Sequence, residues 1–476
     1  MDYHLYINGQ WTPSASGQTF ETVDPATEEP IATVARGTAE DINQAVEAAR
    51  APFAGGWWRT KPPAPARLLY DMARAIERHA GELAELETRD SGKPLNRSLA
   101  EVRSSARYFE FYAGAADKLF GTQIPLGPDY IDFTIREPMG VTAHIVPWNM
   151  PLNMVARSVA PALAAGNTCV VKPAEQTPLT ALRLADLFAE VGFPPGVYNV
   201  VTGFGEEAGG PLASHPGIDS MTFTGSVETG RRIMRAAAEH IKPVVLELGG
   251  KSPHIIFADA DMEIAVAEAT KAITANCGQV CSAGSRLVID NAVREPFLEQ
   301  LTARMEALSV GPGMDNPDMG PLVSAEHYQR VNGYIALGQE EGAQVITGGG
   351  RPAGLERGFF VAPTVFDQAR PDMRIAQEEI FGPVLSVLGF SDEEEALEIA
   401  NGVAYGLVAG IFTNDINRAL RLAGRIKAGQ IYVNEYYAGG EETPFGGYKQ
   451  SGFGREKGLE ALQSYTQVKN VAIRIR

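Results

Sequence analysis

Between residues 141 and 258, short apolar runs alternate with segments of helical periodicity. The apolar runs are TCVVKP at 168–173, GVYNVV at 196–201, SMTFTG at 220–225 and PVVLEL at 243–248, and the helical segments cover 178–191, 205–214 and 228–239. Apolar strands separated by single helices are typical of a parallel sheet with helices on both faces. The pattern therefore predicts a doubly wound α/β domain, a layout suited to nucleotide binding.

The same alternation returns in the second half of the chain. Helical periodicity appears near residues 262–277, 291–308, 324–341, 392–401 and 415–426, and the apolar segments between them include SRLVID, VLSVLGF, VAGIFT and QIYVNE. These segments predict a second α/β domain.

The N-terminal part differs from both. Residues 1–36 read as short strands and turns, and Thr38 with Asp41 then forms a capping-box pattern that predicts a helix start. Longer helices are predicted at about 64–90 and 95–119. The segments 122–140 and 465–476 are strand-like and lie outside the main alternation, and because an unpaired apolar strand tends to aggregate, we expect them to be paired.

Composition narrows the classes of function. A chain of 476 residues, 45% hydrophobic and 21% charged, is long enough for two or more domains of a soluble protein. Its net charge of −17 argues against a nucleic acid or an anionic membrane as partner. No charged leader precedes an apolar core and no window of about twenty uncharged apolar residues occurs, so no membrane association and a cytoplasmic location are expected.

The three cysteines, Cys169, Cys277 and Cys281, are too few for a disulfide scaffold. No histidine or further cysteine lies within ligand spacing of Cys277 and Cys281, so no metal site is predicted. Cys281 stands among small residues in GQVCSAGSR, where a substrate and backbone N–H groups can approach its thiol. It is a candidate nucleophile, and the alternative is a buried core cysteine.

Two further segments carry candidate chemistry. Glu247 lies in the apolar segment PVVLELGG, where desolvation would raise the pKa of its carboxyl into the range of a general base, although an edge-strand glutamate facing water fits the same pattern. Asn149 lies between two prolines in VPWNMPL and is either an oxyanion donor or a turn residue bonded to its own backbone. Together, a thiol, a carboxylate and an amide indicate acyl transfer.

Motifs along the chain identify a family. In order they are PWNMPL, VKPAEQTPL, FTGS, ELGGKSP, GQVCSAGSR, EEIFGPV and PFGGYKQSGFGRE. Their order and spacing resemble those of the NAD(P)-dependent aldehyde dehydrogenase superfamily over nearly the whole chain.

The resemblance implies an α/β architecture in three parts. A doubly wound parallel-sheet NAD-binding domain is expected at residues 1–121 and 141–248, and a second α/β catalytic domain at 249–450. A β-strand oligomerisation arm is expected at 122–140 and 451–476, which would make the protein a homodimer or homotetramer.

The resemblance also implies the reaction. An aldehyde would be oxidised to the carboxylic acid with NAD, through a thiohemiacetal and a thioester on Cys281, with Asn149 holding the oxyanion and Glu247 activating water. A 2′-phosphate would meet the like charge of Glu175, so NAD is expected to be preferred over NADP. The residues expected to contact the cofactor are Val146, Pro147, Trp148, Lys172, Glu175, Gly205, Thr224, Gly225, Ser226, Leu248, Glu379 and Phe381.

The aldehyde tunnel departs from the family pattern. Ser158 stands where the family often has a lysine of a proton relay, and Arg157 stands where a bulky aromatic is usual. We expect Arg157 to pair with a carboxylate, Glu435 being the nearest candidate, and the alternative is that it binds an anionic or hydroxylated substrate end. The residues expected to line the tunnel are Met150, Asn153, Arg157, Glu435, Tyr437 and Phe445.

Two other enzyme classes fit less well. A coenzyme A-acylating dehydrogenase would use the same thioester without a base for water, so Glu247 argues against it. A cysteine hydrolase would need a histidine partner, and none of the seven histidines lies in a matching motif.

Overall fold

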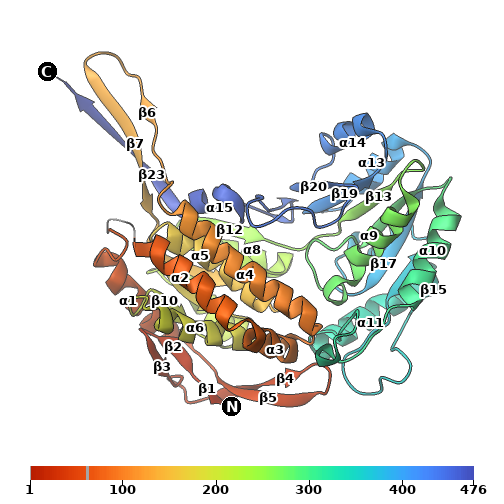
Figure 1. Ribbon diagram of the computed structural model, residues 1–476, viewed down its shortest axis with the longest axis horizontal. Coiled ribbons are helices and arrows are strands. Elements are labelled where there is room, and N and C mark those ends of the chain that lie inside the picture. Colours follow the sequence, from red (N-terminus) through yellow and green to blue (C-terminus); the bar gives the residue numbers. More distant parts are fainter. Residues whose placement is uncertain (1, 60–63, 476) are drawn as a thin grey trace.

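The computed structural model describes residues 2–59 and 64–475. Two large sheets lie side by side, each with its own helices, and a small sheet projects from the first (Figure 1). The α/β architecture with parallel sheets confirms the fold class that the alternation of strands and helices predicts.

The first large sheet has a parallel centre and antiparallel edges. Its five central strands pair in parallel, whereas β2, β3 and β22 are antiparallel to their neighbours. The order is β22 (Gly452–Phe453), β12 (Val244–Glu247), β11 (Ser220–Thr224), β8 (Val141–Ile145), β9 (Thr168–Lys172), β10 (Tyr198–Val200), β2 (Leu5–Ile7) and β3 (Gln10–Thr12).

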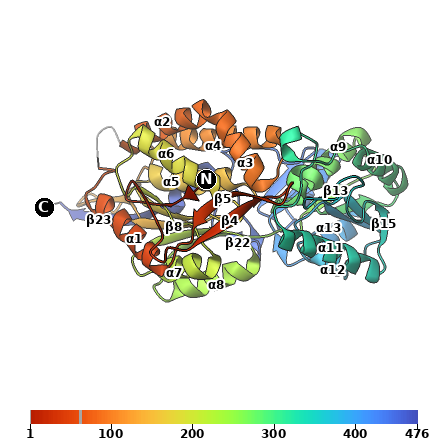
Figure 2. The ribbon, with the colours of Figure 1, turned by 90° about the horizontal axis from the view of Figure 1, so that it is seen from below.

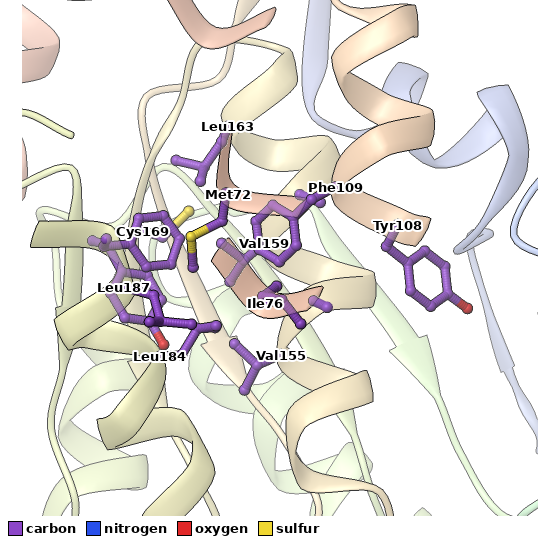
Figure 3. Close-up of a cluster of buried hydrophobic side chains, with 14 of the residues drawn as sticks. Met72, Ile76, Tyr108, Phe109, Val155, Val159, Leu163, Cys169, Leu184 and Leu187 are labelled. Carbon is purple, nitrogen blue, oxygen red and sulfur yellow. The ribbon is translucent and has the colours of Figure 1, made fainter. Parts of the chain in front are cut away.

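Helices cover both faces of this sheet because its central strands are apolar on both sides. One face carries α2 (Ala64–Arg78), α3 (Ala80–Ser91), α4 (Leu95–Ala115), α5 (Pro151–Ala164) and α6 (Leu179–Val191). The other face carries α1 (Ala39–Ala54), α7 (Gly210–Ser214) and α8 (Val227–Ala238). Figure 3 shows Met72, Phe109, Val159 and Leu184 meeting in the first of these cores, while Tyr108 points away from it.

The second large sheet follows the same plan. All its strand pairs are parallel except that of β15 and β16. The order is β15 (Gln344–Thr347), β16 (Thr364–Asp367), β17 (Val384–Phe390), β14 (Arg286–Asp290), β13 (Pro253–Ile256), β19 (Val408–Phe412) and β20 (Gln430–Val433). Its helices are α9 (Met262–Thr274), α10 (Arg294–Glu306), α11 (Ala325–Glu340), α12 (Arg374–Gln377), α13 (Glu393–Asn401) and α14 (Ile416–Ala423).

Three smaller sheets complete the fold. The projecting sheet consists of β6 (Gln123–Ile124), β7 (Tyr130–Pro138) and β23 (Thr466–Arg474), and a short pair joins β18 (Tyr405–Gly406) to β21 (Tyr448–Lys449). The third consists of β1 (Asp2–Tyr3), β4 (Thr19–Asp24) and β5 (Glu29–Ala35). Its β4–β5 turn contacts the second half of the chain, where Phe359 N–H donates to Pro25 O over 3.0 Å (Figure 2).

Two segments differ from the predicted boundaries. The predicted helix at 64–90 is two helices, α2 and α3, which meet at His79. Residues 451–464 do not belong to the projecting sheet, because β22 pairs with β12 of the first large sheet and α15 (Gly458–Ser464) contacts α5.

The Thr38 capping box is confirmed, since Thr38 N–H donates to Asp41 Oδ2 over 2.8 Å. No helix in the described ranges is long and apolar enough to cross a membrane.

Candidate active site

Cys281 lies where two cavities meet. A cavity of about 420 Å³ is lined by α4, α5 and the loop after β20, and a cavity of about 330 Å³ lies between the ends of β11 and β12 and the loop at Glu379. Cys281, Asn149 and Met154 line both of them. We call the first the substrate cavity and the second the nicotinamide cavity. A thiol at their junction can touch the contents of both.

The loop that carries Cys281 is held in an unusual conformation. A 3₁₀ turn (Ala275–Gly278) follows α9, and Asn276 and Cys277 have φ values of 49° and 57°. Gly278 has φ 70°, and a Cβ there would stand 2.1 Å from Gly382 O. Only glycine allows this close approach, so the nucleophile loop packs directly on the loop that follows Glu379.

Hydrogen bonds hold both the side chain and the backbone of Asn149 in place. Its side-chain Nδ2 donates to Gln279 O over 2.8 Å, and its own backbone oxygen accepts from Asn276 Nδ2 over 2.9 Å and from Lys93 Nζ over 3.0 Å. An amide nitrogen carries two hydrogens, so one N–H remains for an oxyanion near Cys281.

A buried ion cluster supports this turn, and the sequence motifs did not indicate it. Lys93 pairs with Glu87 over 3.0 Å and with Glu101, and all three side chains are largely buried. The second oxygen of Glu87 accepts the N–H of Leu152, in the first turn of α5, over 3.2 Å. The cluster therefore ties α3 and α4 to the backbone around Asn149.

Glu247 ends β12 and is buried. Burial raises the pKa of its carboxyl well above the usual value, although Arg157 opposes the shift. Neither of its oxygens accepts a hydrogen bond from the residues that the structure describes. Burial likewise raises the pKa of the Cys281 thiol to about 12. A neutral thiol therefore needs a base, and Glu247 has unoccupied acceptor oxygens.

The partner of Arg157 is Glu456, which corrects the expectation that Glu435 would be its nearest carboxylate. Arg157 Nε forms an ion pair with Glu456, and its Nη2 lies 3.7 Å from Glu247 Oε2. Glu435 follows β20 with its side chain exposed and does not line the substrate cavity. Hydrogen bonds between the backbones of Phe445 and Glu456 place Glu456 next to the wall of the substrate cavity.

The substrate cavity is polar for much of its wall. It contains the predicted residues Met150, Asn153, Arg157, Tyr437 and Phe445. Asn153 Nδ2 donates to Ser104 Oγ over 3.0 Å, and Ser104 Oγ donates to Glu441 Oε1 over 2.5 Å. Further lining residues that the motifs did not indicate are Arg97, Glu101, Ser104, Tyr108, Lys271, Glu441 and Lys457.

The predicted cofactor residues divide between two cavities. The nicotinamide cavity is lined by Pro147, Trp148, Thr224, Gly225, Ser226, Leu248, Glu379 and Phe381. A further cavity of about 780 Å³ is lined by Glu175 and Gly205, and Glu326 lines both cavities. Lys172 pairs with Glu175 over 3.0 Å and Val146 N–H donates to Lys172 O, but neither Val146 nor Lys172 is among the residues lining the two cavities.

These residues fit NAD. A Cβ at Gly249 would stand 2.1 Å from Glu379 Oε2, so the glycine leaves room for that carboxylate, whose Oε1 accepts Gly250 N–H over 3.0 Å. Ser226 caps α8, and the first turn of a helix presents N–H groups to an anion such as a pyrophosphate. Because Glu326 lines both cavities, an extended ligand such as a dinucleotide can occupy them together.

Helix α11 holds the loop at Glu379, a contact that the motifs did not indicate. His327 Nε2 donates to Phe381 O over 2.6 Å, and Arg330 donates to Glu379 O over 2.8 Å. Burial lowers the pKa of His327 to about 4, so its ring is neutral at physiological pH. Phe381 has φ 64°, and these contacts stabilise that strained backbone.

Comparisons with known proteins agree with this site. The model of the Aldehyde dehydrogenase family matches residues 11–471. The hydroxyisobutyraldehyde dehydrogenase of Mycolicibacterium austroafricanum is 48% identical over 99% of this chain and 94% of its own. An NAD+ complex of an aldehyde dehydrogenase from Bacillus cereus has a TM-score of 0.98 and 46% identity, covering 100% of this chain and 97% of that chain. A betaine aldehyde dehydrogenase from Staphylococcus aureus in complex with NAD+ has a TM-score of 0.97 and 41% identity, covering 98% and 94%.

Proposed function

The chain belongs to the aldehyde dehydrogenase family and oxidises aldehydes to carboxylic acids with NAD, and we propose that Cys281, Asn149 and Glu247 perform this reaction. The observation that carries the assignment is that Cys281 and Asn149 line the substrate and nicotinamide cavities together. Glu247 lines the nicotinamide cavity beside them.

The first step is covalent attack. Glu247 accepts the proton of the Cys281 thiol, and the sulfur forms a bond to the aldehyde carbon while the carbonyl electron pair moves to oxygen. The free N–H of Asn149 Nδ2 and the backbone N–H of Cys281 hold that oxyanion. The residues of the nicotinamide cavity would hold NAD, which would supply the hydride acceptor for the substrate carbon. The remaining acyl group is a thioester on Cys281.

The second step is hydrolysis. The proton that Glu247 took from the thiol first leaves to solvent. Glu247 then deprotonates a water, whose oxygen attacks the thioester carbon, and the carbon–sulfur bond breaks to release the acid and the Cys281 thiolate, which takes the proton back from Glu247. The raised pKa of Glu247 suits both proton transfers, because burial makes this carboxylate a stronger base than one in water.

The experiment that tests the assignment follows NADH absorbance with an aldehyde panel. Cys281→Ala abolishes oxidation and retains NAD binding, measured by quenching of tryptophan fluorescence, because the nucleophile does not hold the cofactor. Glu247→Gln slows the first turnover as well as the later ones, so no fast burst of NADH appears, because Glu247 takes the proton of the Cys281 thiol and later that of the water. Cys169→Ala is the control, since Cys169 is buried in the core of the first sheet. Substantial turnover by Cys281→Ala would refute the assignment.

The cofactor preference, the assembly and the location are further parts of the proposal. NAD is preferred over NADP because Glu175, Glu206 and Glu207 line the larger cavity and repel a 2′-phosphate.

The projecting sheet pairs subunits into a homodimer or homotetramer, and the protein is cytoplasmic. The substrate of the proposed reaction is a polar aldehyde, because much of the wall of the substrate cavity is polar. The name of the relative from M. austroafricanum, a hydroxyisobutyraldehyde dehydrogenase, supports this proposal because its aldehyde carries a hydroxyl group.

A further inference from the structure

Lys457 lines the substrate cavity and has no role in the reaction described above. It follows Glu456 directly and precedes α15. Its Nζ lies 5.9 Å from the centre of the Phe445 ring, and Arg157 lies over the same ring at 4.7 Å. No ion pair or hydrogen bond joins Lys457 Nζ to any other residue in the described ranges.

The backbone of Lys457 is strained. Its φ of 62° and ψ of 170° fall in a region that is essentially confined to glycine. Glycine would adopt this conformation freely, whereas a lysine destabilises the fold here unless the surroundings hold it. A long cationic side chain at such a position is an unusual feature that the fold itself does not require.

Most of the other charged side chains of the cavity already have a partner of opposite charge. Arg157 is bound to Glu456, Lys271 lies 3.2 Å from Glu268, and Glu101 is bound to Lys93. Among the cavity-lining cations of the described chain, only Lys457 and the exposed Arg97 have side chains without an ion pair. The ammonium of Lys457 therefore remains available to a ligand.

We propose that Lys457 binds a carboxylate at the far end of the aldehyde, so that the preferred substrates are semialdehydes of short dicarboxylic acids. The inference rests on the proposed function of Cys281, because both residues line one cavity of about 420 Å³. An ammonium and a carboxylate form a charge-assisted hydrogen bond, and Asn153 and Ser104 offer polar contacts along the same wall.

The charges around Lys457 favour a carboxylate over a phosphate. The groups that act on it are Arg157 from α5 and Glu441, Glu442 and Glu456 from the loop before α15. A doubly charged phosphate would be repelled by Glu441 and Glu442 more strongly than a single carboxylate. Burial and Arg157 lower the pKa of Lys457 to about 8, which leaves the ammonium protonated for the most part at neutral pH.

The test compares three aldehydes of equal length: succinic semialdehyde, 4-hydroxybutanal and butanal. Lys457→Met keeps the apolar stem and the backbone conformation but removes the charge. It should raise KM for succinic semialdehyde by about tenfold or more and leave the other two substrates nearly unchanged, since a charged hydrogen bond is lost. Lys457→Arg should restore most of the preference. Succinate should inhibit the wild type competitively and inhibit Lys457→Met far more weakly.

Other results would overturn the inference. Equal losses on all three aldehydes would mean that Lys457 shapes the cavity without recognising the substrate, and a loss confined to 4-hydroxybutanal would mean that it recognises a hydroxyl group. Lys457→Gly relieves the backbone strain, so a stable glycine variant that still prefers succinic semialdehyde also excludes the proposal. The rate of the wild type with butanal distinguishes a failure of the proposed Cys281 reaction from a failure of the proposed Lys457 contact. Butanal has no carboxylate, so its oxidation depends on Cys281 but not on Lys457.

Discussion

The guanidinium of Arg157 lies between the buried carboxylates of Glu247 and Glu456. This arrangement determines whether a proton on Glu247 can be passed on to Glu456. A guanidinium is not deprotonated in proteins, so Arg157 holds charge but does not pass a proton from Glu247 to Glu456. Ser158 offers no route either, because its hydroxyl donates to Met154 O over 3.1 Å. Arg157 therefore acts on Glu247 through its charge.

Replacing Arg157 tests this effect. Burial raises the pKa of Glu247 and Arg157 lowers it, so Arg157→Leu should raise that pKa further. The carboxylate that acts as base then forms only at higher pH, and the acid limb of the pH profile of kcat moves to higher pH. Leaving Glu456 unpaired should also cost about 3–5 kcal/mol of unfolding free energy. Arg157→Lys is the control that keeps the charge, and an unmoved acid limb in the leucine variant would contradict the role.

Glu175 tests the cofactor preference at the same scale. Glu175→Ser removes a carboxylate from the wall of the larger cavity and frees Lys172 from its ion pair. The kcat/KM for NADP should rise relative to that for NAD, because repulsion of the 2′-phosphate is lost. Steady-state kinetics with both cofactors measure the ratio. Comparable values for the two cofactors in the wild type would refute the preference.

Among the elements, α3 and α4 hold the turn before α5 through Lys93. Its Nζ donates to Asn149 O, and Glu87 accepts the N–H of Leu152. The position of the oxyanion donor thus depends on helices that supply no reacting group.

Lys93→Met should reduce kcat more than it changes KM for the aldehyde, because Asn149 loses a fixed backbone partner. It should also lower the unfolding free energy by about 3–5 kcal/mol, since Glu87 and Glu101 are left without their cation. Urea denaturation and steady-state kinetics measure the two effects. Lys118→Met is the control, because Lys118 is exposed and its ion pair is with exposed Asp117, far from the turn at Asn149 in the sequence. A stable variant with full kcat would refute the positioning role.

For the whole molecule, the projecting sheet determines assembly in our proposal. β23 pairs with β7 from Thr466 to Arg474, and the outer side chains of this sheet include exposed Ile131, Val468 and Ile473. Exposed apolar residues on a projecting sheet favour a contact with a second copy.

The double variant Ile131→Lys and Ile473→Lys should therefore shift the protein to a smaller species in light scattering coupled to size-exclusion chromatography. Ile241→Lys is the control, since Ile241 is 91% exposed and lies between α8 and β12, outside the projecting sheet. An unchanged mass for the double variant would assign the interface to another surface.

Much of the fold was predictable because it rests on local pattern. Apolar runs became parallel strands, and Thr38 with Asp41 began α1 as the capping box indicates. The break at His79 and the pairing of β22 with β12 were missed, because a continuous helical period does not show a break and a two-residue strand has no period to read. Lys457 was missed although it directly follows the motif PFGGYKQSGFGRE, because its significance lies in its φ and its position in the cavity.

The sequence by itself determined the family, the reaction class and the order of strands and helices, since side-chain chemistry and periodicity are carried by the chain. Only the tertiary structure decided that Arg157 pairs with Glu456, that Lys93 supports Asn149, and that Lys457 faces the substrate cavity unpaired. The physical reason is that an ion pair or a cavity wall depends on distances between residues far apart in the chain. Such distances are set by the packing of the two large sheets and their helices.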